Sequence, residues 1–191
     1  MTSRIYPDQK PWSRESAQAF LDMAGGLPGF EQIGEKQLDA AIALHRMLIT
    51  GGIAYLADEV GMGKTYVALA VVALCRHLQP GFRVLYLAPS RNVMRKWHER
   101  EQPAFIRNNV RAPDMRVRGL GGQSPGQAVC CQTVDEWVAS SIANPTALDV
   151  FLTFSALSFP LGGDRAAWTQ RVKGMAHRAG ISTDLRGITH K

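Results

Sequence analysis

The chain has 191 residues, of which 46% are hydrophobic and 20% are charged, and its formal net charge is +6. This composition argues against a wholly disordered or collagen-like chain, and the three cysteines without Cys-x-x-Cys spacing indicate neither a disulfide scaffold nor a zinc knuckle. The sequence shows no apolar leader and no run approaching the roughly 20 apolar residues of a membrane span, so we expect a cytoplasmic protein without a membrane partner.

The N-terminal part of the chain predicts two helices and a strand. Residues 1–34 are interrupted by glycine and proline and predict a loop-rich extension, in which residues 13–23 form a short helix. Residues 36–49 carry apolar side chains at helical spacing, and the glycines at 51 and 52 predict the end of that helix. The short apolar run at residues 53–57 predicts a buried strand.

The next elements alternate between helix and strand. Residues 64–78 predict a helix that is apolar on every side and is therefore buried. Residues 83–88 predict a strand, and residues 91–101 predict a basic helix with Ser90 as its N-cap. Residues 102–127, which are rich in arginine, glycine and proline, predict an irregular connection.

The C-terminal part predicts a helix at residues 133–142, a strand at residues 150–154 and a helix at residues 164–179. Strands that alternate with helices are typical of a parallel sheet with crossover connections. The sequence therefore predicts an α/β fold.

The positive charge is concentrated in one window of the sequence. Residues 76–118 contain 10 basic and 3 acidic residues, a net charge of +7, whereas residues 1–65 have a net charge of −2. Arginine dominates the window, and its guanidinium group favours bidentate contact with phosphate. Two interpretations stay open, a solvated helix face and a surface that contacts a polyanion.

The strongest local motif is a phosphate-binding loop that ends in Gly-Lys-Thr. Glycines let backbone N–H groups turn toward phosphate oxygens, and the helix that follows directs its free N–H groups to the same place. Lys64 can reach the β- and γ-phosphates of a nucleotide, and the Thr65 hydroxyl can bind Mg²⁺. The predicted nucleotide-binding residues are Asp58, Glu59, Val60, Gly61, Met62, Gly63, Lys64 and Thr65.

Asp58 departs from the usual phosphate-loop pattern, which has glycine at this position. With this departure, residues 56–65 resemble motif I of the superfamily 2 helicase-like ATPases, especially the SNF2-like branch, where an acidic residue commonly replaces the first glycine. Gln37 resembles the upstream glutamine that recognises the adenine ring in many members of this superfamily. Its alternative interpretation is an exposed glutamine near a helix N-terminus.

Residues 85–97 are similar to motif Ia of the same family. There, the turn after the strand contacts the nucleic-acid backbone and the next helix runs to a tryptophan. The resemblance implies nucleic-acid contacts at Pro89, Ser90, Arg91, Arg95 and Lys96, although the basic residues also fit a solvated helix face. Trp97 fits a core anchor better. Residues 150–157 resemble motif Ib, through a weaker match.

The resemblance implies a partial RecA-like fold of the P-loop NTPase type, with three layers around a parallel sheet. Residues 35–191 would be an incomplete first ATP-binding lobe. ATP and Mg²⁺ would be its ligands, and a nucleic acid its partner, DNA rather than RNA.

A complete ATPase of this kind also needs a buried strand that ends in Asp-Glu, to hold Mg²⁺ and to position the attacking water. The sequence contains Asp-Glu twice, at 58–59 inside the phosphate loop and at 135–136, which precedes the strand at 150–154 and has a partly polar flank. The His-Arg-Ala-Gly sequence at 177–180 better fits a helix end than the arginine motif of a second lobe.

We therefore expect a truncated or split ATPase that does not hydrolyse ATP alone, and whose partner is the remainder of the enzyme or a complementing subunit. Open sheet edges would make the chain alone marginally stable or prone to aggregation. The alternatives are a P-loop NTPase of another class and a non-enzymatic module that binds a polyanion or a partner protein.

Overall fold

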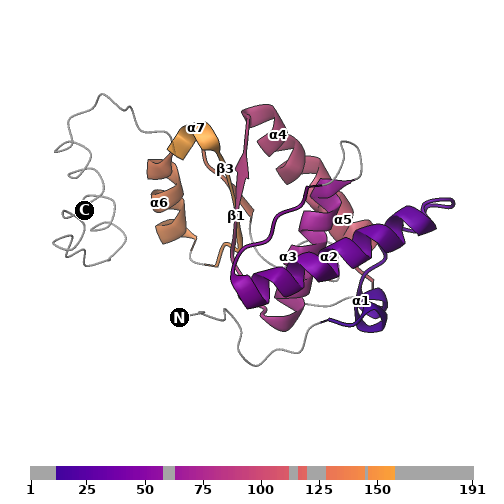
Figure 1. Ribbon diagram of the computed structural model, residues 1–191. Coiled ribbons are helices and arrows are strands. Elements are labelled where there is room, and N and C mark those ends of the chain that lie inside the picture. Colours follow the sequence, from indigo (N-terminus) through magenta and orange to yellow (C-terminus); the bar gives the residue numbers. More distant parts are fainter. Residues whose placement is uncertain (1–11, 58–62, 112–115, 120–127, 145, 158–191) are drawn as a thin grey trace. The chain divides into compact units, whose positions relative to one another are not determined.

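The computed structural model describes residues 12–57, 63–111, 116–119, 128–144 and 146–157 (Figure 1). The chain divides into two compact units, one formed by Met1–Phe82 with Lys96–Pro125 and the other by Arg83–Arg95 with Gly126–Lys191. No helix among the described residues is long and apolar enough to cross a membrane.

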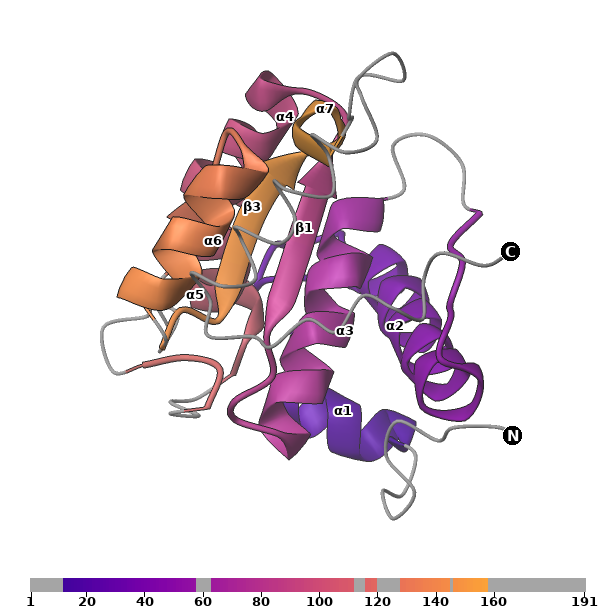
Figure 2. The ribbon, with the colours of Figure 1, turned by 90° about the vertical axis from the view of Figure 1, so that its left-hand side faces the viewer.

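The first unit is helical. Its described elements are helices α1 (Arg14–Phe20), α2 (Glu31–Gly51) and α3 (Lys64–Leu78), a π-helix η1 (Trp97–Glu101) and helix α5 (Gln102–Asn109). α2 and α3 pack side by side (Figures 1 and 2). The helices predicted at 13–23, 36–49 and 64–78 are thereby confirmed, although α2 begins five residues earlier than the apolar pattern.

Local signals explain where these helices begin and end. The Ser13 side chain accepts a hydrogen bond from the backbone N–H of Ser16, which caps α1. Gly52 adopts the left-handed conformation (φ +75°) that ends α2, as the glycine pair predicted. In α3 every residue from Leu69 to Leu74 is buried except Val72, which is half-buried. This burial confirms the expectation of a buried helix.

The segment before α2 is tied to the end of α5. Leu21 and Val110 form an antiparallel bridge. The side-chain amide of Asn109 donates to the carbonyl oxygens of Asp22, at 2.8 Å, and Met23, at 3.2 Å. Residues far apart in sequence therefore share one core in this unit, and the predicted boundary between residues 34 and 35 stays a prediction.

The second unit contains a parallel sheet. Its elements are strands β1 (Val84–Ala88), β2 (Ala128–Cys130) and β3 (Asp149–Thr153) and helices α6 (Val134–Ala143) and α7 (Phe154–Leu157). Helix α4 (Arg91–Lys96) follows β1 and belongs to this unit except for its last residue. The strand order is β1-β3-β2, and both pairs are parallel. This arrangement confirms the mixed α/β class and agrees with part of a RecA-like lobe.

In this unit the position of β3 and the N-cap of α6 agree with the predictions from the sequence. Val84 pairs with Asp149 and Ala88 with Thr153, so β3 occupies the predicted 150–154 run with a shift of one residue. The Thr133 side chain accepts a hydrogen bond from the backbone N–H of Glu136, which begins α6 where a helix was predicted.

The strand predicted at residues 53–57 is wrong. These residues belong to no strand of the described chain, and Ile53 and Tyr55 are 81% and 80% exposed. A strand needs a hydrogen-bonded neighbour, whereas the described strands pair only with one another. An apolar run alone does not supply that neighbour.

One further expectation is corrected. The connection predicted at 102–127 is helical at its beginning, since α5 follows directly from η1 and the residues at the junction, Glu101 and Gln102, keep helical backbone angles. The three-residue strand β2 was not predicted. The helix predicted at 164–179 lies outside the described residues.

Candidate functional site

The described end of the phosphate loop forms the N-terminus of α3. Gly63 caps this helix with φ +74° and ψ 32°, in the left-handed region that favours glycine. Its carbonyl oxygen accepts hydrogen bonds from the N–H groups of Tyr66, at 2.9 Å, and Val67, at 3.1 Å. Lys64 and Thr65 are thus the first two residues of the helix, and their amides have no acceptor within the helix.

Charge and exposure at this helix end suit a phosphate. Gly63, Lys64 and Thr65 are all half-buried, and the first turn of α3 carries no acidic residue. The positive end of the helix dipole favours an anion at this position. The other predicted loop residues, Asp58, Glu59, Val60, Gly61 and Met62, lie outside the described residues.

Gln37 on α2 approaches this helix end directly. A Cβ atom added at Gly63 would collide with the Nε2 atom of the Gln37 side chain. The carboxamide therefore lies against the glycine at the end of the phosphate loop, and Gln37 is half-buried. This packing does not fit the interpretation of Gln37 as an exposed glutamine near a helix N-terminus.

Tyr66, next to Thr65, is a residue that the motifs did not single out. Its ring packs edge-to-face on Phe105 of α5 with ring centroids 5.6 Å apart. Burial raises the pKa of the Tyr66 phenol, and the Glu101 carboxylate raises it further, whereas Lys96 opposes the shift. Tyr66 thereby joins the first turn of α3 to α5, which only the three-dimensional structure shows.

The residues predicted to contact nucleic acid are exposed. Pro89, Ser90, Arg91 and Arg95 lie in the second unit, where the Ser90 hydroxyl accepts a hydrogen bond from the Val93 N–H at 3.4 Å, in agreement with its predicted N-cap role.

Lys96 belongs to the first unit and has a local partner. Its Nζ atom lies 2.7 Å from the Glu101 Oε1 atom. This ion pair offsets part of the charge that a phosphate would meet. Trp97 is half-buried at the start of η1, so the expected core anchor is only partly buried.

The basic window is not one uniform surface. Arg76 is only 2% exposed, and its Nε–H donates to the Phe82 carbonyl oxygen at 3.2 Å. Arg118 donates to the Val110 carbonyl oxygen at 2.7 Å. These two arginines stabilise the fold, whereas Arg91 and Arg107 are exposed.

Asp135 and Glu136 lie in the first turn of α6 rather than at a strand end. A Glu136 carboxylate oxygen accepts a hydrogen bond from the Gln132 backbone N–H at 2.6 Å. An acidic pair in a first helical turn stabilises the helix dipole. This position agrees with the expectation that 135–136 is not the missing acidic motif.

One family model matches part of the chain. Residues 36–119 match the family described as type III restriction enzyme, res subunit, a helicase-like region of superfamily 2. The matched segment contains Gln37, the phosphate loop, α3 and the residues from Pro89 to Lys96. The chain matches no curated protein and no solved structure. The superfamily expected from the motifs is thus supported over residues 36–119, whereas the SNF2-like branch stays a prediction.

Proposed function

We propose that this chain is the ATP-binding portion of a nucleic-acid-dependent, superfamily 2 helicase-like ATPase. The observation that carries the proposal is the position of the Gln37 carboxamide against Gly63, at the N-terminus of the helix that begins with Lys64 and Thr65. A base-recognising amide and a phosphate-binding helix end are thereby adjacent. Glycine at position 63 leaves room for this amide, because a Cβ atom there would displace it.

Each part of the nucleotide would have its own contacts. The amides of the first turn of α3 and the Lys64 ammonium group would hold the phosphates, and the Thr65 hydroxyl would bind Mg²⁺. The Gln37 carboxamide offers both a donor and an acceptor, as an adenine edge requires. Residues 58–62 would complete the loop.

Titration of the 191-residue chain with a fluorescent ATP analogue and Mg²⁺ tests this site. Lys64→Ala should abolish binding, and Gln37→Ala should reduce the preference for ATP over GTP. Arg46→Ala, which removes an exposed positive charge from the same helix as Gln37, is the matched control and should bind normally. Unchanged binding by Lys64→Ala would disprove the nucleotide site.

Nucleic-acid contact is proposed for the turn at Pro89 and Ser90 and for Arg91 and Arg95, with a smaller contribution from the paired Lys96. The name of the matched family refers to a restriction enzyme, so we propose DNA rather than RNA.

Affinity for single-stranded DNA should fall with salt. A plot of the logarithm of the binding constant against the logarithm of the salt concentration should have a slope of about −0.7 for each phosphate contacted. Arg91→Gln with Arg95→Gln should reduce this slope, whereas exposed Arg107→Gln should not. Binding that is independent of salt would contradict this half of the proposal.

Hydrolysis is proposed to need acidic residues from another polypeptide segment. Of the two Asp-Glu pairs in the sequence, one lies inside the phosphate loop and the other caps α6. The remainder of the ATPase or a complementing subunit would supply the pair, and we propose that the protein is cytoplasmic. Asp58, which stands where the phosphate-loop pattern has glycine, favours the SNF2-like branch. Robust ATP turnover by the purified chain would refute this need.

A second candidate is a non-enzymatic module that binds polyanions. The exposed arginines at 91, 95 and 107 favour it, because such binding needs no phosphate loop. It predicts that Lys64→Ala leaves DNA binding unchanged and that ATP has no effect on it.

A further inference from the structure

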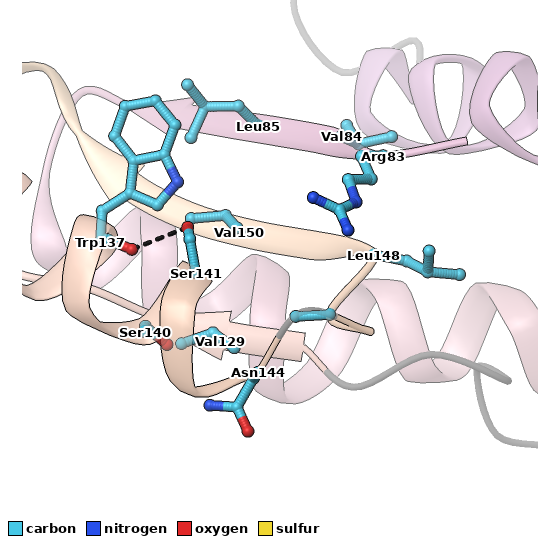
Figure 3. A pocket seen from close by; sticks show the side chains of 11 residues that line it. Arg83, Val84, Leu85, Val129, Trp137, Ser140, Ser141, Asn144, Leu148 and Val150 are labelled. Carbon is cyan, nitrogen blue, oxygen red and sulfur yellow. Dashed lines mark hydrogen bonds between the residues drawn. The ribbon is translucent and has the colours of Figure 1, made fainter. Parts of the chain in front are cut away.

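A pocket of about 260 Å³ opens in the second unit, between α6 and the parallel sheet (Figure 3). All of its lining residues belong to this unit. None of the residues of α6 is buried, so this helix borders the sheet without packing closely on it. The part of α6 that lines the pocket consists of Trp137, Ser140, Ser141 and Asn144, whose spacing of i, i+3, i+4 and i+7 places them on one helical face.

The sheet side of the pocket is apolar and incompletely covered. Leu85, Val129 and Val150 contribute aliphatic side chains from β1, β2 and β3. Parallel strands usually have both faces buried, yet Leu85 is 37% exposed. Water in the pocket leaves this aliphatic surface hydrated, whereas the face of a flat apolar ligand would remove it from water. The sheet side therefore favours a ligand with a planar, apolar face.

The helix side of the pocket is polar but uncharged. Ser140 and Asn144 each offer a donor and an acceptor, and neither side chain has a hydrogen-bond partner among the described residues. The Ser141 hydroxyl instead donates to the Trp137 carbonyl oxygen at 2.8 Å (Figure 3). Arg83 also lines the pocket but already has an interaction of its own, so its charge is not counted as a ligand contact. The helix side therefore favours an uncharged ligand edge that both donates and accepts hydrogen bonds.

From this geometry we infer a second ligand site, for a small, uncharged, planar heterocycle with a hydrogen-bond donor beside an acceptor on one edge. The ring lies on the strand side chains beside Trp137, and its polar edge pairs with Ser140 and Asn144. A charged group is disfavoured, because its desolvation against the aliphatic strands is not offset by a free opposite charge. The volume of about 260 Å³ admits one or two fused rings and is small for a whole nucleotide. The site uses none of the residues of the proposed nucleotide site.

Calorimetric titration of the 191-residue chain with three bicyclic probes tests the site. The probes are 2-quinolone, a neutral lactam with an N–H beside its carbonyl group, N-methyl-2-quinolone, which lacks the donor, and quinoline-2-carboxylate, which is anionic. Saturable binding should be tightest for 2-quinolone and about tenfold weaker for each of the other two. Tighter binding of the carboxylate than of 2-quinolone, equal affinity for the two lactams, or no saturable binding of 2-quinolone would overturn the proposal.

Variants locate the probe. Ser140→Ala combined with Asn144→Leu should abolish the preference for 2-quinolone over its N-methyl form. Ser140→Phe, which fills the pocket from α6, should abolish binding of both lactams. Asn108→Leu removes an exposed carboxamide from the other unit and should keep both the affinity and the preference.

Saturating ATP with Mg²⁺ should leave the affinity for 2-quinolone unchanged, because the two sites share no residue. Circular dichroism establishes that each variant is folded. Binding of 2-quinolone that survives Ser140→Phe, or that ATP competes away, would place the probe outside this pocket and overturn the proposal.

Discussion

Gly63 links backbone conformation to nucleotide recognition. At φ +74° its conformation favours glycine, and the Gln37 amide occupies the space that a side chain would need. Gln37 is long and flexible, so a methyl group at position 63 would displace the carboxamide at little cost in packing. The consequence should therefore be in ligand selectivity more than in stability.

Gly63→Ala should destabilise the chain by about 1–2 kcal/mol, the usual cost of left-handed backbone for a residue with a Cβ atom. It should also reduce the preference for ATP over GTP, as is expected for Gln37→Ala. Gly26→Ala is the control, since Gly26 has φ +71° with nothing near its missing Cβ. Chemical denaturation and nucleotide titration measure both effects. Full retention of selectivity by Gly63→Ala would show that the Gln37 contact has no role in binding.

His45 is a buried residue of α2 with a consequence for pH. It is 1% exposed, and neither ring nitrogen has a hydrogen-bond partner among the described residues. Burial lowers the pKa of His45 below its ordinary value of 6.5. In the unfolded chain the ring takes up a proton near that value, whereas the folded chain resists protonation to a lower pH.

The free energy of unfolding should therefore be independent of this group above about pH 7.5 and should fall as the pH drops below 6.5, by at most about 1.4 kcal/mol per pH unit. His45→Leu should remove this part of the pH dependence, whereas His98→Gln should keep it. Urea denaturation at pH 7.5 and 5.5 measures the difference. The same pH dependence in His45→Leu as in the unmodified chain would assign it to other groups.

At the scale of helices and strands, the sequence predicts the elements whose formation depends on residues close to one another in the chain. The bounds of α3 follow from a continuous apolar pattern after Gly63. The strand at 53–57 fails because pairing depends on a distant segment. α5 was missed because the arginine, glycine and proline content of residues 102–127 predicted an irregular connection, whereas the helical backbone continues from η1 into α5.

The first turn of α6 has a structural role that can be separated from catalysis. The Thr133 hydroxyl accepts from the Glu136 N–H at 3.1 Å, and the Glu136 carboxylate accepts from the Gln132 N–H at 2.6 Å. Thr133→Ala should destabilise the chain by about 1 kcal/mol, and Thr133→Ser should restore most of that loss. Thermal unfolding measures both. ATP binding should remain unchanged in Glu136→Ala, and loss of binding without loss of stability would instead favour a role in the nucleotide site.

At the scale of the whole molecule, the candidate site was predicted in part. The Gly-Lys-Thr ending is visible in the sequence as a phosphate-loop pattern and Gln37 through family resemblance, and the structure adds the contact between Gln37 and Gly63. Within the basic window, the resemblance to motif Ia singled out Arg91, Arg95 and Lys96. The burial of Arg76 was not predicted, because it depends on packing, which net charge does not describe.

Exposed apolar surface sets the solution behaviour expected of the whole chain. Ile53 and Tyr55 are 81% and 80% exposed, and in the described sheet β1 and β2 each pair on one side only. Unpaired strand edges and exposed large apolar side chains both favour association between chains. We therefore expect the chain to self-associate as its concentration rises, with an apparent unfolding temperature that depends on concentration.

Replacing both Ile53 and Tyr55 with lysine should reduce this association, because it introduces charge into a short apolar run without removing buried area. Ile142→Lys is the control, as it adds a lysine at a 49% exposed apolar position of the other unit. Light scattering after size-exclusion chromatography measures the mass at several concentrations. If residues 53–57 are the association surface, the double variant becomes more monomeric than the control. If the unmodified chain is already a monomer that unfolds cooperatively at every concentration, the open edges have no such effect.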